Sequence, residues 1–379
     1  MIVWREDVLG AGFECADLDL GSDSEGPLVA TLVRSLPRPR GFVQRLLRRE
    51  RLLEDVDVLY VHGWSDYFFQ REMAAFWTDR GARFFALDLR KYGRSLREGQ
   101  TAGYIERLDD YHQEIGLAVA AISGDAAISG NAESAWEVGG ATSAAVAAVD
   151  AGSAGRFDPE PGRRLVLLGH STGGLVLSLW AAQHPGGFDA LVLNSPWLEF
   201  QLASAGRQLL TPLITLSSRL HPLEVAPQLD YGYYTRAQRE VGPQGELATV
   251  DTAWRPERTH AVRGGWLRAI LDGHARVSRG LGIDAPIEVL LSAHSAAPIK
   301  WSEELTRADS VLDVDEVAKA ALRLGSSVTV DRIDDALHDV FLSREHAREE
   351  AYARLERWLI GWQAANRSAP EHGPDRLGS

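Results

Sequence analysis

The sequence predicts an α/β protein with a mostly parallel central sheet and helices on both faces. Short apolar runs of the length of buried strands alternate with segments that have helical character. At residues 165–174 one such run leads directly into Gly-His-Ser-Thr-Gly-Gly and then into an apolar helix. The chain has 379 residues, of which 45% are hydrophobic, so it can bury a large core.

The first elements are expected in the N-terminal third of the chain. Strands are predicted over residues 28–34, 56–63 and 82–89, and a helix over residues 104–122. The basic run 38–51 lies between the first two strands and is expected to form an exposed linker and a short amphipathic turn. A solvated charged face is the default interpretation of that run, and contact with a membrane surface is the alternative.

Residues 123–162 interrupt this pattern. Their composition changes to Ala, Gly and Ser with scattered acidic residues, whereas a helix-to-strand connection normally has only a few residues. A flexible surface insertion that is partly helical at most is therefore expected there.

The next strand and turn carry the strongest signal for chemistry. Gly169, Ser171 and Gly173 form a G-x-S-x-G between an apolar strand and the helix predicted over 175–184. This is the context of a nucleophile elbow, in which a strained turn presents the serine hydroxyl at the positive end of a helix. Ser171 is thus a candidate nucleophile. The alternative is a glycine-rich turn with a structural role.

A serine nucleophile needs a base, which after such an elbow follows an acidic residue in the chain. Strands are expected at residues 286–292 and 326–333, and a loop follows each of them. His338 is the histidine that lies after the last strand and before the final helix. It is the candidate base, and a loop histidine that caps the following helix is the alternative.

Two aspartates compete for the role of the acid. Asp309 and Asp313 both lie in the loop after the strand at 286–292. Asp313 has Glu316 three residues further on, which is the pattern of a capping box at the start of a helix. That structural role leaves Asp309 as the better candidate, with Asp313 as the second choice.

The groups that would stabilise an oxyanion are expected at two backbone positions. One is the N–H of Thr172, which follows the candidate nucleophile, and the other lies after the strand 56–63. That strand ends in His62-Gly63, so Trp64 is the candidate for the second donor. Gly63 would let the backbone approach the reacting carbonyl. An ordinary strand-to-loop turn is the alternative.

Taken together, these residues resemble the α/β-hydrolase superfamily, and within it the monoglyceride lipase, lysophospholipase and serine aminopeptidase-like group. The resemblance rests on an ordered set of motifs: His62-Gly63, residues 84–95, Gly169 to Gly174, residues 191–196 and residues 337–339. It implies an α/β-hydrolase fold with an inserted lid. It also implies Ser171, Asp309 and His338 as the catalytic triad, and Trp64 and Thr172 as backbone oxyanion donors.

The sequence departs from that group at two places near the mouth of the site. Ser65-Asp66-Tyr67 stands where relatives commonly have a Glu-His pair, and Lys91-Tyr92-Gly93 where they commonly have Gly-His-Gly. The specificity of the group for acyl-glycerols therefore does not transfer directly.

A second insertion lies between the strand at 190–194 and the strand at 286–292. We expect a core made of residues 1–196 and 282–379, and a lid at residues 197–281, where lids occur in this superfamily. The apolar segment 209–220 and a set of aromatic residues either line a pocket for an acyl or aryl group or hold the lid onto the body. These aromatic residues are Tyr231, Tyr233, Tyr234, Trp254 and Trp266.

The composition limits which molecules the protein is expected to bind and where it is expected to be located. The formal net charge of −13 argues against nucleic acids and anionic membranes, and no apolar run is long enough to span a bilayer. The single Cys15 excludes an internal disulfide framework, and the charged N-terminus does not resemble a signal peptide. A cytoplasmic enzyme is expected. No cofactor or metal is expected, because Asp251, His260, Asp272 and His274 lack paired ligand spacing.

The expected activity is hydrolysis of a carboxylic ester through an acyl-enzyme intermediate, with an acyl-glycerol, a lysophospholipid or another small lipophilic ester as substrate. Amide or peptide hydrolysis is the alternative within enzymes, and a hydrolase-fold binding protein without catalysis is the alternative outside them. The acyl chain, the alcohol and the oligomeric state are left open.

Overall fold

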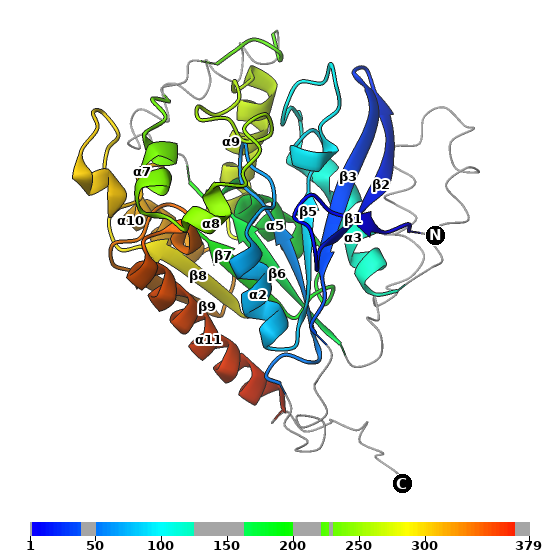
Figure 1. Cartoon of the computed structure of the whole chain (residues 1–379), viewed down its shortest axis with the longest axis vertical. Coiled ribbons are helices and arrows are strands. Elements are labelled where there is room, and N and C mark those ends of the chain that lie inside the picture. Colours follow the sequence, from blue (N-terminus) through cyan, green and yellow to red (C-terminus); the bar gives the residue numbers. More distant parts are fainter. Residues whose placement is uncertain (1, 39–50, 125–162, 200–220, 227–229, 368–379) are drawn as a thin grey trace.

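A nine-stranded sheet organises the part of the chain that the structure describes (Figure 1). The computed structural model describes residues 2–38, 51–124, 163–199, 221–226 and 230–367. The strands are β1 (Arg5–Glu6), β2 (Glu14–Asp23), β3 (Gly26–Ser35), β4 (Val56–Val61), β5 (Arg83–Asp88), β6 (Arg164–His170), β7 (Ala190–Asn194), β8 (Ile287–Ser292) and β9 (Val328–Ile333).

The order of the strands is β1-β2-β3-β5-β4-β6-β7-β8-β9. From β5 to β9 all neighbours are parallel, whereas β1, β2 and β3 pair antiparallel and join the sheet through β3 and β5. The parallel strands all end at the same edge of the sheet, which is where ligand sites of open α/β sheets lie.

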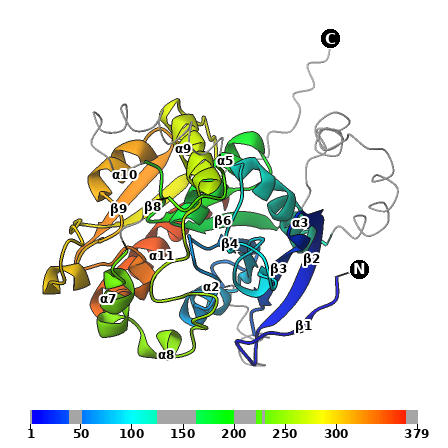
Figure 2. The same ribbon diagram turned by 90° about the horizontal axis from the view of Figure 1, so that it is seen from above.

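Helices cover both faces of this sheet (Figure 2). The α-helices are α2 (Arg71–Asp79), α3 (His112–Ile122), α5 (Thr172–Gln183), α7 (Tyr233–Val241), α8 (Gln244–Leu247), α9 (Gly264–Ser278), α10 (Val314–Ala321) and α11 (Glu345–Arg367). Short 3₁₀ helices are η1 (Gly93–Ser95), η2 (Leu108–Tyr111), η4 (Glu303–Thr306) and η5 (Val340–Leu342).

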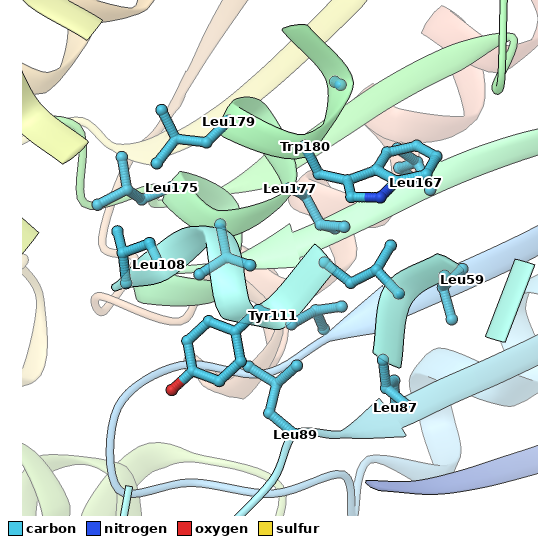
Figure 3. Close-up of a cluster of buried hydrophobic side chains, with 14 of the residues drawn as sticks. Leu59, Leu87, Leu89, Leu108, Tyr111, Leu167, Leu175, Leu177, Leu179 and Trp180 are labelled. Carbon is cyan, nitrogen blue, oxygen red and sulfur yellow. The ribbon is translucent and has the colours of Figure 1, made fainter. Parts of the chain in front are cut away.

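Side chains of the strands alternate between two separate cores. Leu59 of β4 and Leu167 of β6 pack with α3, α5 and α9 on one face, part of which is drawn in Figure 3. Val58 and Val166, their neighbours in the sequence, pack with α2 and α11 on the other face. Both faces are apolar because each is covered by helices, as expected for the parallel part of a sheet.

The predicted α/β class, the mostly parallel sheet and its six parallel strands are confirmed, with ends that shift by one or two residues. The helix predicted over 104–122 was too long at its start. Gly103 has φ +64°, Arg107 is extended, and the regular α-helix begins only at His112 after a 3₁₀ turn. The chain needs this irregular path to turn from the end of β5 onto the face of the sheet.

The sequence interpretation missed several elements, among them β2 and α2. Strand β2 alternates acidic residues with buried Leu18 and Leu20, which is the pattern of an edge region with one solvated face. Helix α2 buries Met73, Phe76 and Trp77 on the opposite face of the sheet. Three predicted segments lie mostly or wholly outside the described residues: the basic run 38–51, the insertion 123–162 and the apolar segment 209–220. The structure therefore does not test those three predictions.

Candidate active site

Ser171 lies between the end of β6 and the first residue of α5, as the elbow pattern predicts. Its backbone has φ 51° and ψ −117°, a combination that is sterically costly for a residue with a side chain. The turn is held by two backbone hydrogen bonds, one from Ser171 N–H to the Asn194 oxygen (3.0 Å) and one from Trp197 N–H to the Ser171 oxygen (2.9 Å). The structure therefore maintains a strained turn at this serine.

The glycines around Ser171 are required by close backbone contacts. A Cβ on Gly169 would lie 2.7 Å from Gly174 Cα, and a Cβ on Gly173 would lie 2.3 Å from the His62 oxygen. A Cβ on Gly63 would lie 3.0 Å from the Cβ of Ser171 itself. The last contact shows that the loop after β4 lies directly against the candidate nucleophile.

His338 and Asp309 are brought together from different loops. The Nδ1–H of His338 donates a hydrogen bond of 2.8 Å to Asp309 Oδ2, and both residues are buried. The other oxygen of Asp309 accepts the backbone N–H groups of Val311 and Leu312, each at 2.7 Å. One carboxylate oxygen is thereby committed to its own turn, and the other is oriented toward the imidazole.

This arrangement fixes the tautomer of the histidine. A carboxylate can only accept a hydrogen bond, so the proton of neutral His338 is on Nδ1 and its Nε2 has a free lone pair. Among the described residues Nε2 is buried without a hydrogen-bond partner. The ring centroid of His338 is 5.0 Å from that of His170, the residue before Ser171. No direct hydrogen bond from Ser171 Oγ to His338 is found in the described part, and such bonds are often long in unliganded sites.

Asp313 has the capping role that the sequence pattern assigns to it. Its side chain accepts hydrogen bonds from the N–H groups of Asp315 and Glu316 at the start of α10, and it is exposed to solvent. Asp309, in contrast, is 1% exposed and lies against the base. Asp309 thus contacts His338, whereas Asp313 caps α10.

Of the two backbone positions predicted as oxyanion donors, Thr172 directly follows Ser171, and Trp64 follows Gly63, which lies against Ser171. Thr172 is the first residue of α5, so its N–H has no acceptor within the helix. The Nε2 of His62 accepts the N–H of Leu89 (3.1 Å), which leaves the proton on Nδ1 to be donated to the Gly63 oxygen (2.8 Å). Because the N–H of a trans peptide points opposite to its C=O, the N–H of Trp64 points away from His62.

Asp339 is a site residue that the sequence interpretation missed. It is fully buried and accepts hydrogen bonds from the side-chain amides of Asn194 and Gln70, both at 2.7 Å. Asn194 Oδ1 in turn accepts the N–H of Val340 (3.2 Å), so the loop that carries His338 is tied to the end of β7. The available signal was an asparagine that closes a strand of Val and Leu.

His170 remains neutral beside this group. Burial lowers the pKa of its imidazole, and the negative charge of Asp339 only partly offsets that effect. Its Nδ1–H donates to the Asn194 oxygen (3.1 Å). His170 therefore adds packing and a backbone hydrogen bond to the turn, without a positive charge next to the base.

Three indole rings pack together, and two of them belong to residues whose backbone lies near the candidate nucleophile: Trp64 follows Gly63, and the Trp197 N–H bonds the Ser171 oxygen. The ring centroids of Trp64 and Trp266 are 4.0 Å apart, and those of Trp197 and Trp266 are 5.9 Å apart. Trp266 is 1% exposed and comes from α9, so this ring packs α9 onto the body of the protein. We call Trp64, Trp197 and Trp266 the indole cluster.

The other aromatic residues that were considered as pocket walls lie elsewhere. Trp254 packs edge-on against Tyr67 (5.1 Å between ring centroids), and Tyr233 packs against Tyr231 (5.5 Å) and Trp301 (5.9 Å). Only Tyr234 of this group contacts the candidate base, with its ring 5.6 Å from that of His338 among the described residues.

At the two places where the sequence departs from the family pattern, charged side chains form ion pairs. Asp66 forms an ion pair of 2.8 Å with Arg255. Lys91 has φ 63°, which is unfavourable for a residue with a side chain, and pairs with Asp23 and Glu25 at the tip of the β2–β3 hairpin, both at 2.6 Å. The hairpin thus stabilises a backbone conformation that glycine would adopt without strain.

The described residues hold no candidate metal site and no candidate membrane span. No group of three or more His, Cys, Asp or Glu in these residues is arranged to hold a metal ion. His274 instead contacts the Trp197 oxygen through Nε2 (2.8 Å), and Asp251 Oδ1 accepts the N–H of Ala253 (2.8 Å). No helix in the described ranges is long and apolar enough to cross a membrane.

Comparisons with known proteins bear on the fold and on part of the sequence. Residues 154–294 match the family described as serine aminopeptidase, S33, a range that includes Ser171 and ends before Asp309. No curated protein matches the chain significantly in sequence.

Solved structures with the same fold include two lipases and an esterase. The Paleococcus ferrophilus monoacylglycerol lipase is 16% identical (TM-score 0.53; 82% of this chain and 96% of that chain covered). The Saccharomyces cerevisiae monoglyceride lipase is 13% identical (TM-score 0.55; 91% and 96%), and a carboxyl esterase from Bacillus coagulans is 12% identical (TM-score 0.57; 92% and 99%). The chain is therefore an α/β-hydrolase by fold, and it resembles the group of monoglyceride lipases and serine aminopeptidases within that superfamily.

Proposed function

We propose that this protein hydrolyses carboxylic esters with Ser171 as nucleophile, His338 as base and Asp309 as the acid that orients the base. The observation that carries the proposal is the buried hydrogen bond between Asp309 and His338 Nδ1, which leaves Nε2 as a proton acceptor beside the strained elbow. A binding protein without catalysis has no need for a strained serine, a tautomer-fixing carboxylate and an acceptor nitrogen together.

In the proposed mechanism, His338 Nε2 removes the proton of Ser171 Oγ as this oxygen attacks the ester carbonyl. The carbonyl π-electrons move to oxygen, and the N–H groups of Thr172 and Trp64 stabilise the resulting oxyanion. Collapse of the tetrahedral intermediate breaks the bond to the alkoxide, which takes the proton from His338 and leaves as the alcohol. Asp309 keeps its charge throughout and stabilises the imidazolium.

The second half-reaction uses the same groups. Water attacks the acyl-enzyme, His338 accepts its proton, and a second oxyanion forms between the two N–H groups. Release of the carboxylic acid returns the proton to Ser171 Oγ. No cofactor is needed for either step.

The substrate class is a small lipophilic ester. The indole cluster would supply aromatic surface to the site, and such walls suit an acyl or aryl group. The titles of the structural neighbours name lipases and an esterase, which supports ester chemistry. Amide or peptide hydrolysis is the second candidate, because the matching family is described as serine aminopeptidase.

The proposal also divides the chain into a catalytic core and a cap. Residues 1–196 and 282–379 would form the catalytic core, and residues 197–281, here called the cap segment, would cover it. The contact of Trp266 in α9 with Trp64 supports this division. A cytoplasmic location remains part of the proposal.

The test combines covalent labelling with turnover. A fluorophosphonate probe should label the wild type, and p-nitrophenyl esters should be hydrolysed, whereas Ser171→Ala should lose both. Because the triad acts as a unit, His338→Ala should lose nearly as much, and the double variant should lose little more.

Matched controls are available on the surface. Ser278 is an exposed serine near the end of α9, and His346 is an exposed histidine whose Nε2 lies 3.2 Å from Asp335 Oδ2. Ser278→Ala and His346→Ala should retain labelling and turnover. Wild-type labelling in Ser171→Ala would contradict the proposal.

A further inference from the structure

A buried polar chain joins the cap segment to the loop that carries His338 and to the loop that carries the proposed oxyanion donor Trp64. It runs from Asp66 through Arg255, Gln238 and Tyr234 to the backbone N–H of Asp339, and three of these side chains belong to the cap segment. From it we propose that Tyr234 is a positioning residue for His338. The inference rests on the proposed function, because it assigns a role toward the proposed base.

Tyr234 touches the base loop in two ways. Its ring meets the ring of His338 edge-on, with 5.6 Å between centroids. Its hydroxyl oxygen accepts the backbone N–H of Asp339, the next residue, at 3.1 Å. One side chain thus contacts the imidazole and also satisfies a backbone donor beside it.

The direction of the hydrogen bonds along the chain is determined by Arg255. A guanidinium can only donate, so the amide oxygen of Gln238 faces Arg255 (2.6 Å) and its NH₂ faces Tyr234 (2.7 Å). The phenol oxygen therefore accepts two N–H groups. Gln238 has no exposed surface, so water cannot replace either partner.

The far end of the chain reaches the loop with the predicted oxyanion donor. Arg255 pairs with Asp66 at 2.8 Å, and their side chains are only 10% and 7% exposed. Asp66 follows Trp64 by two residues, and the Ser65 hydroxyl between them accepts the N–H of His260 in the cap segment (3.0 Å). The cap segment consequently holds both loops in one arrangement.

The phenol of Tyr234 stays protonated and uncharged beside His338. Removal from water raises the pKa of its phenol well above 10, and the nearby charge of Asp339 raises it further. The group is a neutral hydroxyl at any pH at which a histidine base works, and it places no new charge on His338.

Loss of the hydroxyl should loosen the base. Without it, Asp339 N–H and the Gln238 amide would each lack a partner inside the protein, which is costly enough to shift the loop. A shift of the loop would lengthen the hydrogen bond between His338 and Asp309. It would also disturb the alignment of His338 that proton transfer requires.

The variant Tyr234→Phe keeps the ring contact and removes only the hydroxyl. We expect kcat on p-nitrophenyl esters to fall about tenfold with KM nearly unchanged. The low-field proton signal of His338 Nδ1–H, observed by NMR in the free protein, should exchange with water faster than in the wild type. The control is Tyr233→Phe, the preceding residue, whose ring packs on Tyr231 and Trp301; it should change neither value.

The outcomes separate this inference from the proposed function. An active wild type with an unchanged kcat and an unchanged His338 signal in Tyr234→Phe would overturn the role of Tyr234 alone. A wild type that resists fluorophosphonate and hydrolyses no ester would overturn the proposed function, and the NMR signal would still decide whether Tyr234 positions His338. A lower melting temperature in Tyr234→Phe with both other values unchanged would show a purely structural role and overturn the inference.

Discussion

The imidazole of His62 donates its Nδ1–H to the carbonyl oxygen of Gly63 at 2.8 Å, and this bond sets the orientation of the peptide that follows. The N–H of that peptide belongs to Trp64, the proposed second oxyanion donor. His62 would thereby orient the hydrogen bond that Trp64 is proposed to donate to the oxyanion.

Replacement of His62 by Phe should therefore reduce catalysis more than binding. The ring would still pack edge-on against Tyr92, but the peptide would be free to rotate. Removal of one oxyanion donor costs a factor of about 10²–10³ in kcat in a serine protease, so a misoriented donor should cost about ten- to a hundredfold. Steady-state kinetics on p-nitrophenyl esters would measure it, with KM expected to change little.

A matched control for this variant is His184→Phe. His184 also bonds a backbone oxygen through Nδ1 (2.8 Å to Trp180) and stacks on an aromatic ring, but it lies at the other end of α5. A similar loss of kcat in both variants would show that the effect of His62 comes from stability alone.

The variant Asp309→Asn should lower turnover by a large factor without unfolding the protein. The amide oxygen would keep the bonds to Val311 and Leu312 N–H, so its NH₂ would face His338 Nδ1. That contact requires an unprotonated Nδ1 and puts the proton on Nε2, which is the wrong tautomer for a base. The analogous change in a serine protease costs on the order of 10⁴ in kcat.

The neighbouring aspartate provides the comparison for this prediction. Asp313→Asn should have almost no effect, because Asn caps a helix about as well as Asp, and Asp313→Ala should cost about 1 kcal/mol of stability with turnover retained. Turnover and urea midpoints of the three variants decide the assignment. Loss of activity in Asp313→Asn together with retention in Asp309→Asn would reverse it.

The indole cluster should limit the size of the acyl or alcohol group. Trp266→Leu removes the ring that packs on both Trp64 and Trp197, and the space should admit longer or bulkier esters. We expect the ratio of kcat/KM for long over short p-nitrophenyl esters to rise about tenfold, within the range of a few methylene groups in an apolar pocket.

Trp254→Leu is the control, because this tryptophan of the cap segment packs on Tyr67 in the other core. A chain-length profile that changes equally in both variants, or in neither, would show that Trp266 only fastens the cap segment to the body.

A buried carboxyl should make stability depend on pH. Glu288 of β8 is 0% exposed, and burial, followed by the charge of Asp331 on β9, raises its pKa from 4.5 to about 9. The folded state keeps a proton that the unfolded chain loses above 4.5, so this group makes the protein less stable as pH rises from about 4.5 to about 9.

Glu288→Gln carries a neutral amide at every pH and should remove this dependence. Urea midpoints at about pH 5 and about pH 8 should converge relative to those of the wild type, where one group contributes up to about 1.4 kcal/mol per pH unit. An identical pH dependence in both proteins would show that Glu288 is ionised in the folded state or shares its proton differently with Asp331.

Local sequence was sufficient for the parts of the fold that depend on short-range patterns. The strand-turn-helix at Ser171 was recognisable because the backbone conformation of the elbow excludes side chains at Gly169 and Gly173. The capping role of Asp313 was recognisable because its partners, Asp315 and Glu316, lie two and three residues away. Periods of two and 3.6 residues are likewise properties of neighbouring positions.

The tertiary structure alone decided which distant groups meet. Asp339 bonds Gln70 and Asn194 across 269 and 145 residues, and Tyr234 bonds Asp339 across 105 residues. No local period encodes such contacts, because they form only after the strands are ordered side by side and helix α7 packs near their ends. The sequence by itself therefore determined which residues are suited to the chemistry, whereas long-range packing decided which of them lie close enough to act together.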